Sequence, residues 1–351
     1  MEDFEQRKRD HIQLALDPSS QATDQSGLDR WVMRHEALPE LSFSELSLAA
    51  SGPFGLQPTP FFISGMTAGH PDAPKINAVL AEAAAARGWI LGIGSQRRDL
   101  KGNSQTAVGE GVEFWKQIRK KHPHLVILGN LGIAQAIHAS TSEVRRLVET
   151  IGAQGMCIHL NGLQEVMQEG GTPDFRGGLQ AIRRLTQELG VPMIVKETGS
   201  GMSPETAVRL VGAGVKIIDV SGLGGTHWGR IDGRRAAALG VRRLASETFS
   251  HWGISTAESI FTINNKALPG CTLWASGGVR SGLDAAKLLG LGANAVGYAQ
   301  PALKAALDGL EALHRWMEQQ EFELKTALFC TGSETPKELA GKVRRSEEWS
   351  R

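Results

Sequence analysis

Eight short runs of apolar residues recur along the middle of the chain, and each ends in small or polar residues. Their apolar character is unbroken, without the strict alternation of a half-exposed strand, which is typical of strands buried on both faces of a parallel sheet. We therefore predict eight buried strands: FFISGM (61–66), WILGIGS (89–95), LVILGNLG (125–132), GMCIHLN (155–161), PMIVKETG (192–199), VKIIDVSG (215–222), TLWASGG (272–278) and ANAVGYAQ (293–300).

Helix-start signals lie in the gaps between these runs. A serine followed three residues later by an acidic residue predicts a capped helix N-terminus, and Ser203 before Pro204 predicts another. Eight strands alternating with helices predict an α/β fold, a single-domain (β/α)8 TIM barrel, and favour it over a doubly wound open sheet. The serine–acid pairs are Ser140 with Glu143, Ser255 with Glu258 and Ser281 with Asp284.

Three segments fall outside this repeat. Residues 1–60 form an N-terminal extension of the barrel domain, with a helical start and a Pro-, Ser- and Gly-rich stretch. Residues 223–270 form a long, partly helical insertion after the sixth strand, and 331–351 form a C-terminal tail behind the barrel at 61–330. Because long segments at the C-terminal ends of barrel strands generally form lids or binding loops, we expect the first two to cover the site.

Charge and composition narrow the class of partner. The 38 Lys and Arg residues balance 37 Asp and Glu residues, and a net charge of +1 argues against a surface that binds nucleic acid. No apolar stretch approaches the roughly 18 residues of a membrane span, and the N-terminus lacks the apolar core of a secretory signal. The three cysteines are scattered, with no CxxC pair, which is typical of a reducing compartment. We therefore expect a cytoplasmic protein without nucleic-acid or membrane partners.

The polar residues that follow the eight runs are the candidate functional residues, because a barrel carries its active site at the C-terminal ends of its strands. SGGVRSG (276–282) comes after the seventh strand, and GYAQPAL (297–303) after the eighth. Glycine N–H groups and a helix N-terminus at these positions are typical of a phosphate cradle, with two ordinary glycine turns as the alternative.

Three polar features are harder to interpret. Lys196 ends a buried strand, so we expect it to face an anion or an electron-rich ring, with an ion pair to Glu197 or Asp219 as the alternative. The run QRKRDH (6–11) is either a charged surface helix or a flexible arm that closes over an anionic ligand. The segment IHLNGLQE (158–165) places four polar side chains at one strand end.

In order and approximate spacing, the motifs of the chain resemble those of the type II, FMN-dependent isopentenyl diphosphate delta-isomerase family. The resemblance runs from about Arg7 to Gln300. An N-terminal RK-x-DH together with HLN-x-x-QE is specific to this family among flavin barrels, whereas the other motifs are shared with FMN-dependent barrels in general. The motifs are RKRDH, SGMTAG, GIGSQR, GNLG, HLNGLQE, VKETGSG, GLGGTHW and GGVRSG.

The resemblance implies a barrel that interconverts isopentenyl and dimethylallyl diphosphate, with FMN reduced by NADPH and with Mg²⁺ on the diphosphate. Arg7 and Lys8 would bind the diphosphate. Gln164 would lie beside the reacting alkene as the catalytic candidate, and Glu165 would ligate Mg²⁺. The further substrate-binding candidates are His11, Arg97, His159 and Asn161. The FMN-binding candidates are Met66, Thr67, Ala68, Ser95, Asn130, Lys196, Ser221, Thr226, Gly278, Val279, Arg280, Ala299 and Gln300.

The resemblance also shapes our expectations of mechanism and assembly. No side chains in this set form an obvious pair of strong acid and base, so we expect reduced flavin to act as acid and base at N5 in a 1,3-proton shift. Because water would capture a carbocation-like state, we expect 1–30 and 223–270 to close over the site. Barrels of this kind commonly form symmetric multimers, so we expect a homo-oligomer, either a tetramer or an octamer.

Three positions depart from the family pattern. Gly162 stands where the family usually has Pro, Ala68 where it has Gly, and His227 where it has Ser. We expect Gly162 to loosen the loop that carries Gln164, and His227 to add a polar ring beside Thr226. None of the three removes a functional group, so they bear on affinity more than on activity.

Two other functions are weighed against the isomerase. FMN-dependent 2-hydroxy-acid oxidases and dehydrogenases carry a His base and an Arg in an S-N-H-G-x-R pattern, but the stretch here reads Ser221-Gly222-Leu223-Gly224-Gly225. A non-catalytic flavin-binding barrel would not need the RK and QE pairs of the two specific motifs.

Overall fold

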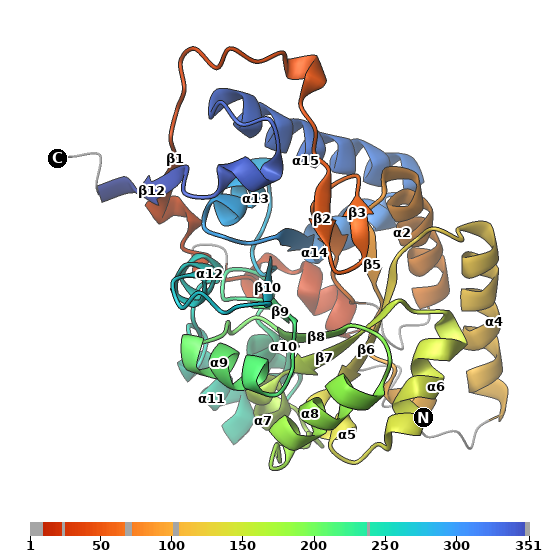
Figure 1. The fold of residues 1–351 in the computed structure, drawn as a ribbon. Coiled ribbons are helices and arrows are strands. Elements are labelled where there is room, and N and C mark those ends of the chain that lie inside the picture. Colours follow the sequence, from red (N-terminus) through yellow and green to blue (C-terminus); the bar gives the residue numbers. More distant parts are fainter. Residues whose placement is uncertain (1–9, 23–24, 67–71, 101–104, 237–238, 348–351) are drawn as a thin grey trace.

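A closed barrel of eight parallel strands forms the centre of the computed structural model (Figure 1). The structure describes residues 10–22, 25–66, 72–100, 105–236 and 239–347, with side chains left out from residue 105 to residue 111. Each barrel strand pairs with the next one along the chain, and the last pairs with the first, so the predicted strands and the barrel are confirmed. The strands are β4 (Phe61–Ile63), β5 (Ile90–Gly92), β6 (Ile127–Gly132), β7 (Gly155–Leu160), β8 (Met193–Glu197), β9 (Ile217–Asp219), β10 (Thr272–Ala275) and β11 (Ala295–Tyr298).

The barrel interior changes from apolar to polar along its axis. One buried apolar residue from every strand contributes to a single cluster: Phe62, Ile90, Leu128, Cys157, Ile194, Ile217, Trp274 and Ala295. Because side chains alternate along a strand, residues two positions later point to the same interior. Most of those positions are polar, namely Ser64, Asn130, His159, Lys196, Asp219 and Ser276. The alternation of side chains thus places these six polar residues, here called the polar floor, at the C-terminal ends of the strands, next to the apolar cluster inside the barrel.

Helices surround the barrel and pack their apolar sides against it (Figure 1). They are α2 (Ala73–Arg87), α4 (Gln105–Lys121), α6 (Thr141–Ile151), α8 (Gly178–Glu188), α9 (Pro204–Gly212), α12 (Thr256–Asn264), α13 (Gly282–Gly290), α14 (Gln300–Leu307) and α15 (Leu310–Cys330). The predicted capping boxes at Ser140 and Ser281 are present, and Ser203 caps α9 before a proline. Ser255 caps α12, but no return bond from Glu258 closes a box there, and its carboxylate accepts a bond from Arg345 at 3.2 Å.

The segments that flank the barrel pair with each other. Strand β1 (Trp31–Met33) and strand β12 (Val343–Arg345) form an antiparallel ladder, which joins the N-terminal extension to the C-terminal tail. The hairpin of β2 (Ala50–Gly52) and β3 (Gly55–Gln57) carries Phe54 at its turn, and Phe54 packs against Trp274 of the interior cluster. Short 3-10 turns complete these segments: η1 (Pro18–Ser20), η3 (Leu28–Arg30), η4 (Phe43–Glu45) and η5 (Pro336–Leu339).

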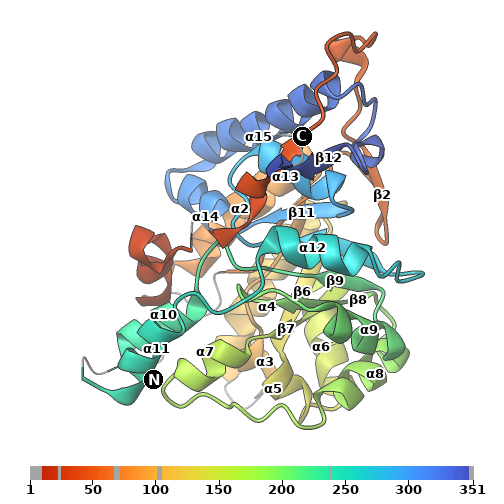
Figure 2. The ribbon, with the colours of Figure 1, turned by 90° about the vertical axis from the view of Figure 1, so that its left-hand side faces the viewer.

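Additional short helices gather at the C-terminal end of the barrel. After β9 come α10 (Trp228–Arg235) and α11 (Val241–Thr248), which lie beside α7 (Gly162–Met167) (Figure 2). The expected insertion at 223–270 therefore consists of these two helices followed by α12, the barrel helix that packs beside α9 and β10. Two further short helices are α3 (Arg97–Leu100) and α5 (Ile133–Ala136).

The N-terminal segment lies against this insertion. Residues 10–16 are helical, and the chain that follows runs antiparallel to the start of α10. Ala22 donates its N–H to the Gly225 carbonyl at 2.8 Å, and His227 donates its N–H to the Ser20 carbonyl at 2.9 Å. Arg230 also donates to the carbonyl of Gln21. These bonds hold the segment beside the strand ends, where the sequence predicted a covering element.

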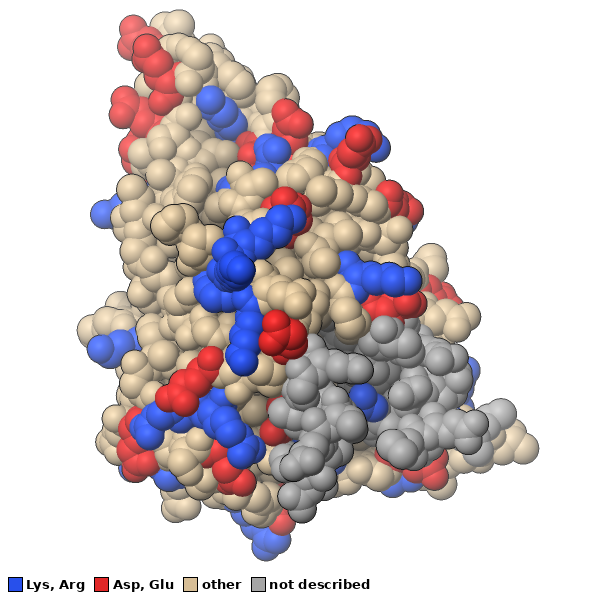
Figure 3. Space-filling model, turned by 90° about the vertical axis from the view of Figure 1, so that its right-hand side faces the viewer, with Lys and Arg blue, Asp and Glu red and all other residues tan. Residues whose placement is uncertain are grey.

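The surface carries charges of both signs. On the face in Figure 3, basic and acidic side chains are interspersed among the described residues. Within the described part of the chain, none of the helices has the length and apolar character needed to cross a membrane.

Candidate functional site

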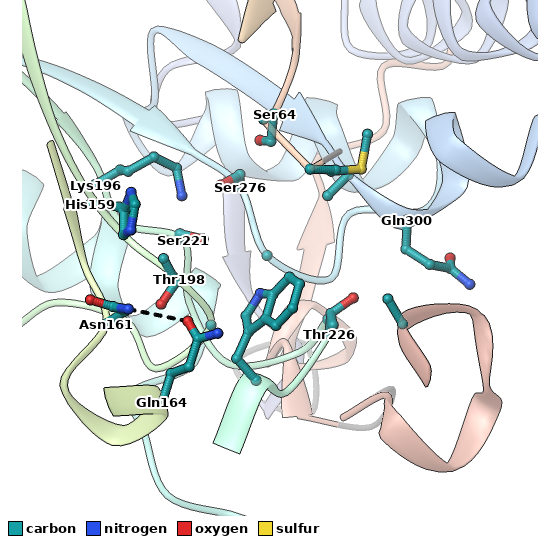
Figure 4. Close-up of a pocket in the computed structure, with 18 of the residues that line it drawn as sticks. Ser64, His159, Asn161, Gln164, Lys196, Thr198, Ser221, Thr226, Ser276 and Gln300 are labelled. Carbon is teal, nitrogen blue, oxygen red and sulfur yellow. Dashed lines mark hydrogen bonds between the residues drawn. The ribbon is translucent and has the colours of Figure 1, made fainter. Parts of the chain in front are cut away.

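One cavity opens at the C-terminal ends of the barrel strands (Figure 4). The predicted residues that the structure describes all line it: His11, Met66, Ser95, Arg97, Asn130, His159, Asn161, Gln164, Glu165, Lys196, Ser221, Thr226, Gly278, Val279, Arg280, Ala299 and Gln300. Arg7, Lys8, Thr67 and Ala68 lie outside the described residues. The structure brings the candidates together, and the ligand that each one contacts remains a prediction.

Two glycine turns form one wall of the cavity by backbone-to-backbone contact. A Cβ atom on Gly278 would lie 2.5 Å from the carbonyl group of Gly224, and Gly278 has a φ of +76°. A Cβ atom on Gly225 would lie 2.7 Å from the Gly278 nitrogen. Arg280 donates to the carbonyls of both Gly224 and Gly278, at 3.0 and 2.8 Å. Only glycine fits at these contacts, and the guanidinium holds the two turns together.

The start of α14 continues this wall. Its N-cap is Ala299, and no side chain caps the first N–H groups of the helix. Gln300 and Pro301 follow, and all three residues line the cavity. Uncapped N–H groups at a helix start, beside glycine turns, form an anion site because the donors and the helix dipole face the same point. The glycine turns and this helix start thus provide donors of the kind that the predicted phosphate cradle needs, and phosphate binding stays a prediction.

Lys196 stands in the polar floor of the barrel. Its Nζ donates to the backbone carbonyl of Glu197 at 2.6 Å, and the residue lines the cavity. Among the described residues, Lys196 forms no ion pair with the carboxylate of Glu197 or Asp219, so that alternative is wrong. Asp219, its register partner on β9, accepts bonds from Ser221 and Ser276 instead. The ammonium group is therefore left to face the cavity.

Two carboxyl groups lie beside this lysine. Burial raises the pKa of Glu197 to about 7, although the N–H groups of Ser200 and Thr198 and the charge of Lys196 act in the opposite direction. Burial also raises the pKa of Asp219, with Lys196 as the largest opposing influence. Both carboxyls are held by several donors, which is typical of structural supports beneath a site.

His159 is oriented by Asn130 in the same floor. The Asn130 amide donates to the Ile93 carbonyl at 3.0 Å, which turns its Oδ1 towards His159. Nδ1 of His159 lies 2.8 Å from that oxygen. Because Oδ1 can only accept, Nδ1 carries the proton, and Nε2 of the neutral ring is an acceptor. The ring is thus positioned to accept a hydrogen bond when neutral and to donate one when protonated.

A cluster at the start of α7 accounts for three of the four polar side chains of the segment 158–165, namely Asn161, Gln164 and Glu165. The Asn161 amide donates to Glu165 Oε1 at 2.9 Å and to Gln164 Oε1 at 3.3 Å (Figure 4). Thr172 donates its N–H to the second oxygen of Glu165 at 2.7 Å. Glu165 is a buried carboxylate with each oxygen held by one donor, and it lines the cavity. In Figure 4 Asn161 and Gln164 lie on the opposite side of the cavity from Gln300.

Asp232 of α10 completes the cluster and was missed in the sequence. One of its oxygens accepts from Gln164 Nε2 at 3.0 Å, and the other lies 2.9 Å from His11 Nε2. Burial raises its pKa, but the bonds from His11 and Gln164 and the charge of Arg235 together outweigh burial and hold that pKa below its usual value. The His11 ring also packs edge-on against Trp228, with 5.4 Å between ring centroids. The N-terminal segment, α10 and α7 therefore meet at one buried carboxylate.

Three buried polar atoms that belong to cavity-lining residues have no partner within the described part of the chain. They are Ser64 Oγ, Asn161 Oδ1 and Gln168 Nε2. A buried polar group without a hydrogen bond is costly, so such groups mark positions where a ligand or water supplies the partner. They occur on both the floor and the α7 side, so a ligand or water at either place would meet an unsatisfied polar atom.

His227 differs from expectation. It is 1% exposed, its Nδ1 accepts the Arg230 N–H at 3.1 Å as the cap of α10, and it does not line the cavity. Burial, with a further contribution from Arg230, lowers its pKa to about 4. The residue therefore does not add a polar ring to the site, because helix capping turns it away. At Gly162, a Cβ atom would approach only Phe175, at 3.8 Å, so no steric reason requires glycine there.

Other lining residues were also missed. Trp228 stands within the motif GLGGTHW, and Gln168 follows the motif HLNGLQE. Both line the cavity, but nothing in the surrounding sequence predicts that their side chains point into it. Ser64 and Ser276 could have been found from the period of two, because each follows an interior apolar residue by two positions.

Comparison with known proteins assigns a family to this architecture. A family model described as FMN-dependent dehydrogenase matches residues 158–345. The isopentenyl-diphosphate delta-isomerase of Bdellovibrio bacteriovorus is 46% identical, over 97% of each chain. The proteins of the same name from Legionella pneumophila and Pseudescherichia vulneris are 46% and 42% identical, over 94% and 95% of this chain and 94% of each relative.

Solved structures agree on the fold. A mandelate oxidase variant with benzaldehyde superposes with a TM-score of 0.64 at 19% identity, covering 98% of this chain and 97% of the oxidase. A flavocytochrome b2 variant with benzoylformate gives a TM-score of 0.68 at 14% identity, covering 95% and 81%. At such low identity the likeness concerns the barrel alone.

Proposed function

Since the chain belongs to the isopentenyl-diphosphate delta-isomerase family, we propose that it interconverts isopentenyl diphosphate and dimethylallyl diphosphate by a 1,3-proton shift. The family resemblance predicted from the motifs is confirmed by these relatives. The proposed enzyme uses FMN reduced by NADPH, requires Mg²⁺, and works as a cytoplasmic homo-oligomer, either a tetramer or an octamer.

One observation carries the proposal. Opposite the glycine turns, the cavity holds a cluster of the buried Asn161 and Glu165 and the partly buried Gln164, tied to His11 through Asp232. Binding a flavin requires none of these residues. An oxidase of 2-hydroxy acids would need a His base at the cavity, but the His of this loop caps α10 instead. The cluster therefore supports a second ligand besides the flavin, and its carboxylate Glu165 suits a diphosphate that is bound through Mg²⁺.

The cavity fits FMN. The cradle at Gly278 and the uncapped start of α14 suit its phosphate, and Lys196 with the unpaired Ser64 hydroxyl suits its ring. The further candidates for this ligand are Met66, Ser95, Asn130, Ser221, Thr226, Val279, Arg280, Ala299 and Gln300. When bound and reduced, the flavin supplies an acid and a base at N5.

The α7 cluster fits Mg²⁺ on a diphosphate. Among the described residues there is no group of three or more His, Cys, Asp or Glu side chains that could enclose an ion. Mg²⁺ is commonly held by one or two carboxylates together with substrate phosphates and waters, so a lone buried carboxylate is sufficient. Glu165 is that carboxylate, and the unpaired Asn161 Oδ1 can accept a bond from a metal-bound water.

The remaining residues position the substrate and exclude water. Gln164 is held from two sides, by Asn161 and by Asp232, so its amide keeps one orientation beside the alkene. An amide is too weak an acid to protonate an alkene alone, and we assign it to orientation and relay. His11, Arg97 and His159 line the cavity and can hold the diphosphate, with Arg7 and Lys8 from the N-terminal arm. Trp228 gives the cavity an apolar wall that keeps water from the reacting carbons.

An anaerobic assay tests the proposal. The protein is mixed with FMN, excess NADPH, Mg²⁺ and isopentenyl diphosphate, and dimethylallyl diphosphate is measured by NMR. We expect product only when the flavin is reduced. Absence of product from a protein whose bound flavin bleaches with NADPH contradicts the proposal, and a screen of 2-hydroxy acids would then follow.

A further inference from the structure

The side chain of Gln168 has no role in the site as described so far. Gln168 ends α7 and is 6% exposed. Its backbone is satisfied, because its N–H donates to the Gln164 carbonyl at 2.8 Å and its own carbonyl accepts from Gly171 at 3.1 Å. Its side-chain amide makes no hydrogen bond with any residue that the structure describes, and Nε2 is fully buried. The residue nevertheless lines the cavity.

Gln168 is the C-cap of α7, and its N–H bonds to the Gln164 carbonyl as within a helix, so it keeps the helical spacing from Glu165, the candidate metal ligand. Residues three and four apart share one face of a helix, with about 5–6 Å between their Cβ atoms. Gln168 is three residues from Glu165 and four from Gln164, and all three line the cavity. The carboxylate of Glu165 is fixed by Asn161 and Thr172, so a ligand on Glu165 is held within reach of the neighbouring amide.

A tight turn keeps this amide inside. The chain after Gln168 folds back so closely that a Cβ atom on Gly171 would lie 2.0 Å from the Glu165 carbonyl oxygen. The same turn delivers the Thr172 N–H to the Glu165 carboxylate. The turn that orients Glu165 therefore also buries Gln168, and yet it offers the amide no partner. A buried amide that costs free energy without a protein partner points to a ligand.

We propose that Gln168 is a further substrate-binding residue, whose amide hydrogen-bonds the oxygen shell of the metal–diphosphate group held at Glu165. The inference rests on the proposed function, since it assumes an anionic substrate with Mg²⁺. An amide can serve this shell in two ways. Its NH₂ group donates to a phosphate oxygen, or its carbonyl accepts from a metal-bound water.

Binding of inorganic pyrophosphate tests the inference without catalysis. The FMN-loaded protein is titrated with pyrophosphate by calorimetry, with and without Mg²⁺. Removing a hydrogen bond to a charged group generally costs about 10- to 100-fold in affinity, so we expect a loss of that size in Gln168→Leu. Loss in both conditions supports contact with phosphate oxygens, and loss only with Mg²⁺ supports contact with metal-bound water.

A matched control is available on another helix. Gln320 of α15 is 1% exposed, and its Oε1 also lacks a partner within the described residues, but it does not line the cavity. Gln320→Leu should leave pyrophosphate affinity within about 2-fold of the parent protein. FMN affinity, measured by flavin fluorescence, should be unchanged in both variants. Gln168→Glu adds a second readout, because a carboxylate repels phosphate oxygens but still accepts from metal-bound water.

The outcomes separate the two claims. Unchanged pyrophosphate affinity in a folded Gln168→Leu protein overturns the inference and leaves the proposed function intact. Equal losses in the Gln168 and Gln320 variants, or a parallel loss of FMN affinity, also overturn it, because they indicate a general structural effect. A parent protein that binds no pyrophosphate in either condition contradicts the diphosphate substrate, and hence the proposed function itself.

Discussion

The side-chain amide of Gln164 donates to the carboxylate of Asp232 at 3.0 Å, across 68 positions of the chain. The other oxygen of that carboxylate lies 2.9 Å from Nε2 of His11, so one buried group links the N-terminal segment, the insertion and α7. A carboxylate suits this position because it has two acceptor oxygens, one for the N–H of Gln164 and one for the N–H of His11. In this arrangement Asp232 orients the side chain of Gln164, the catalytic candidate.

Asp232→Asn should lower kcat by about 10- to 100-fold, since an amide has one acceptor oxygen and at least one bond to this group is lost. We expect FMN affinity to be unchanged, because the cradle lies across the cavity. Steady-state kinetics and flavin titration measure the two effects. Asp10→Asn is the control, because it weakens the 3.0 Å ion pair with Arg235 of α10, which itself lies 3.6 Å from Asp232, and leaves both Asp232 oxygens in place for Gln164 and His11. Equal rate losses in both variants would show that α10 as a whole, not the Gln164 contact, is responsible.

Glu165→Gln should raise the Mg²⁺ concentration needed for half-maximal rate by at least about 10-fold, because it removes the carboxylate that serves the metal. The bonds from Asn161 and Thr172 need two acceptor oxygens, so one of them is also lost. The rate is measured against Mg²⁺ at saturating substrate. A Mg²⁺ dependence identical to that of the parent protein would remove Glu165 from the metal site.

Gly278→Ala should abolish tight FMN binding. The new methyl group would lie 2.5 Å from the backbone of Gly224 and would force the two glycine turns apart. Gly270→Ala is a matched control, since Gly270 has a similar φ of +71° with nothing within 4 Å of the added Cβ. Both variants carry the cost of a left-handed alanine, roughly 1–2 kcal/mol, but only the first carries the clash. Flavin fluorescence titration should show at least a ~10-fold loss for Gly278→Ala alone.

The contributions of Glu197 and His227 to the free energy of unfolding should nearly cancel between pH 4.5 and 6.5, because their pKa values are shifted in opposite directions. The pKa of Glu197 is raised from 4.5 to about 7, so its contribution is present below pH 4.5 and lost as pH rises through 7. The pKa of His227 is lowered from 6.5 to about 4, so its contribution is present above pH 6.5 and lost as pH falls through 4. Each shift corresponds to at most about 3 kcal/mol.

Single variants should reveal how the free energy of unfolding depends on pH for each group alone. In Glu197→Gln only the histidine remains, and the free energy of unfolding should fall as pH drops from 6.5 to 5. In His227→Ser, which keeps a capping hydroxyl, the free energy of unfolding should rise over the interval from pH 7 to 5. Urea unfolding at several pH values gives both slopes. If the two variants show slopes of the same sign, the assignment of these groups is wrong.

The barrel could be predicted from the chain because its signals are local. A buried parallel strand requires an unbroken apolar run, and a helix start requires a cap within a few residues. Both signals can therefore be recognised in short segments of the sequence. The glycines of the cradle also stand in short stretches of the chain, but the contact between Gly278 and Gly224 joins two separate loops and requires the closed barrel. Even the polar floor follows from the period of two, which places Lys196 on the interior face two residues after Ile194.

Tertiary structure alone decided the other side of the site. Asp232 and Trp228 lie in α10, and Gln168 caps the end of α7, so the direction of their side chains depends on how these short helices pack and not on the period of a strand. His227 also points away from the cavity, because its side chain caps α10, although its neighbour Thr226 lines the cavity. The sequence by itself determined the barrel, because its strand and helix-cap signals each arise within a few residues. The tertiary structure determined which side chains share the buried carboxylate of Asp232, because those contacts join segments up to 221 positions apart.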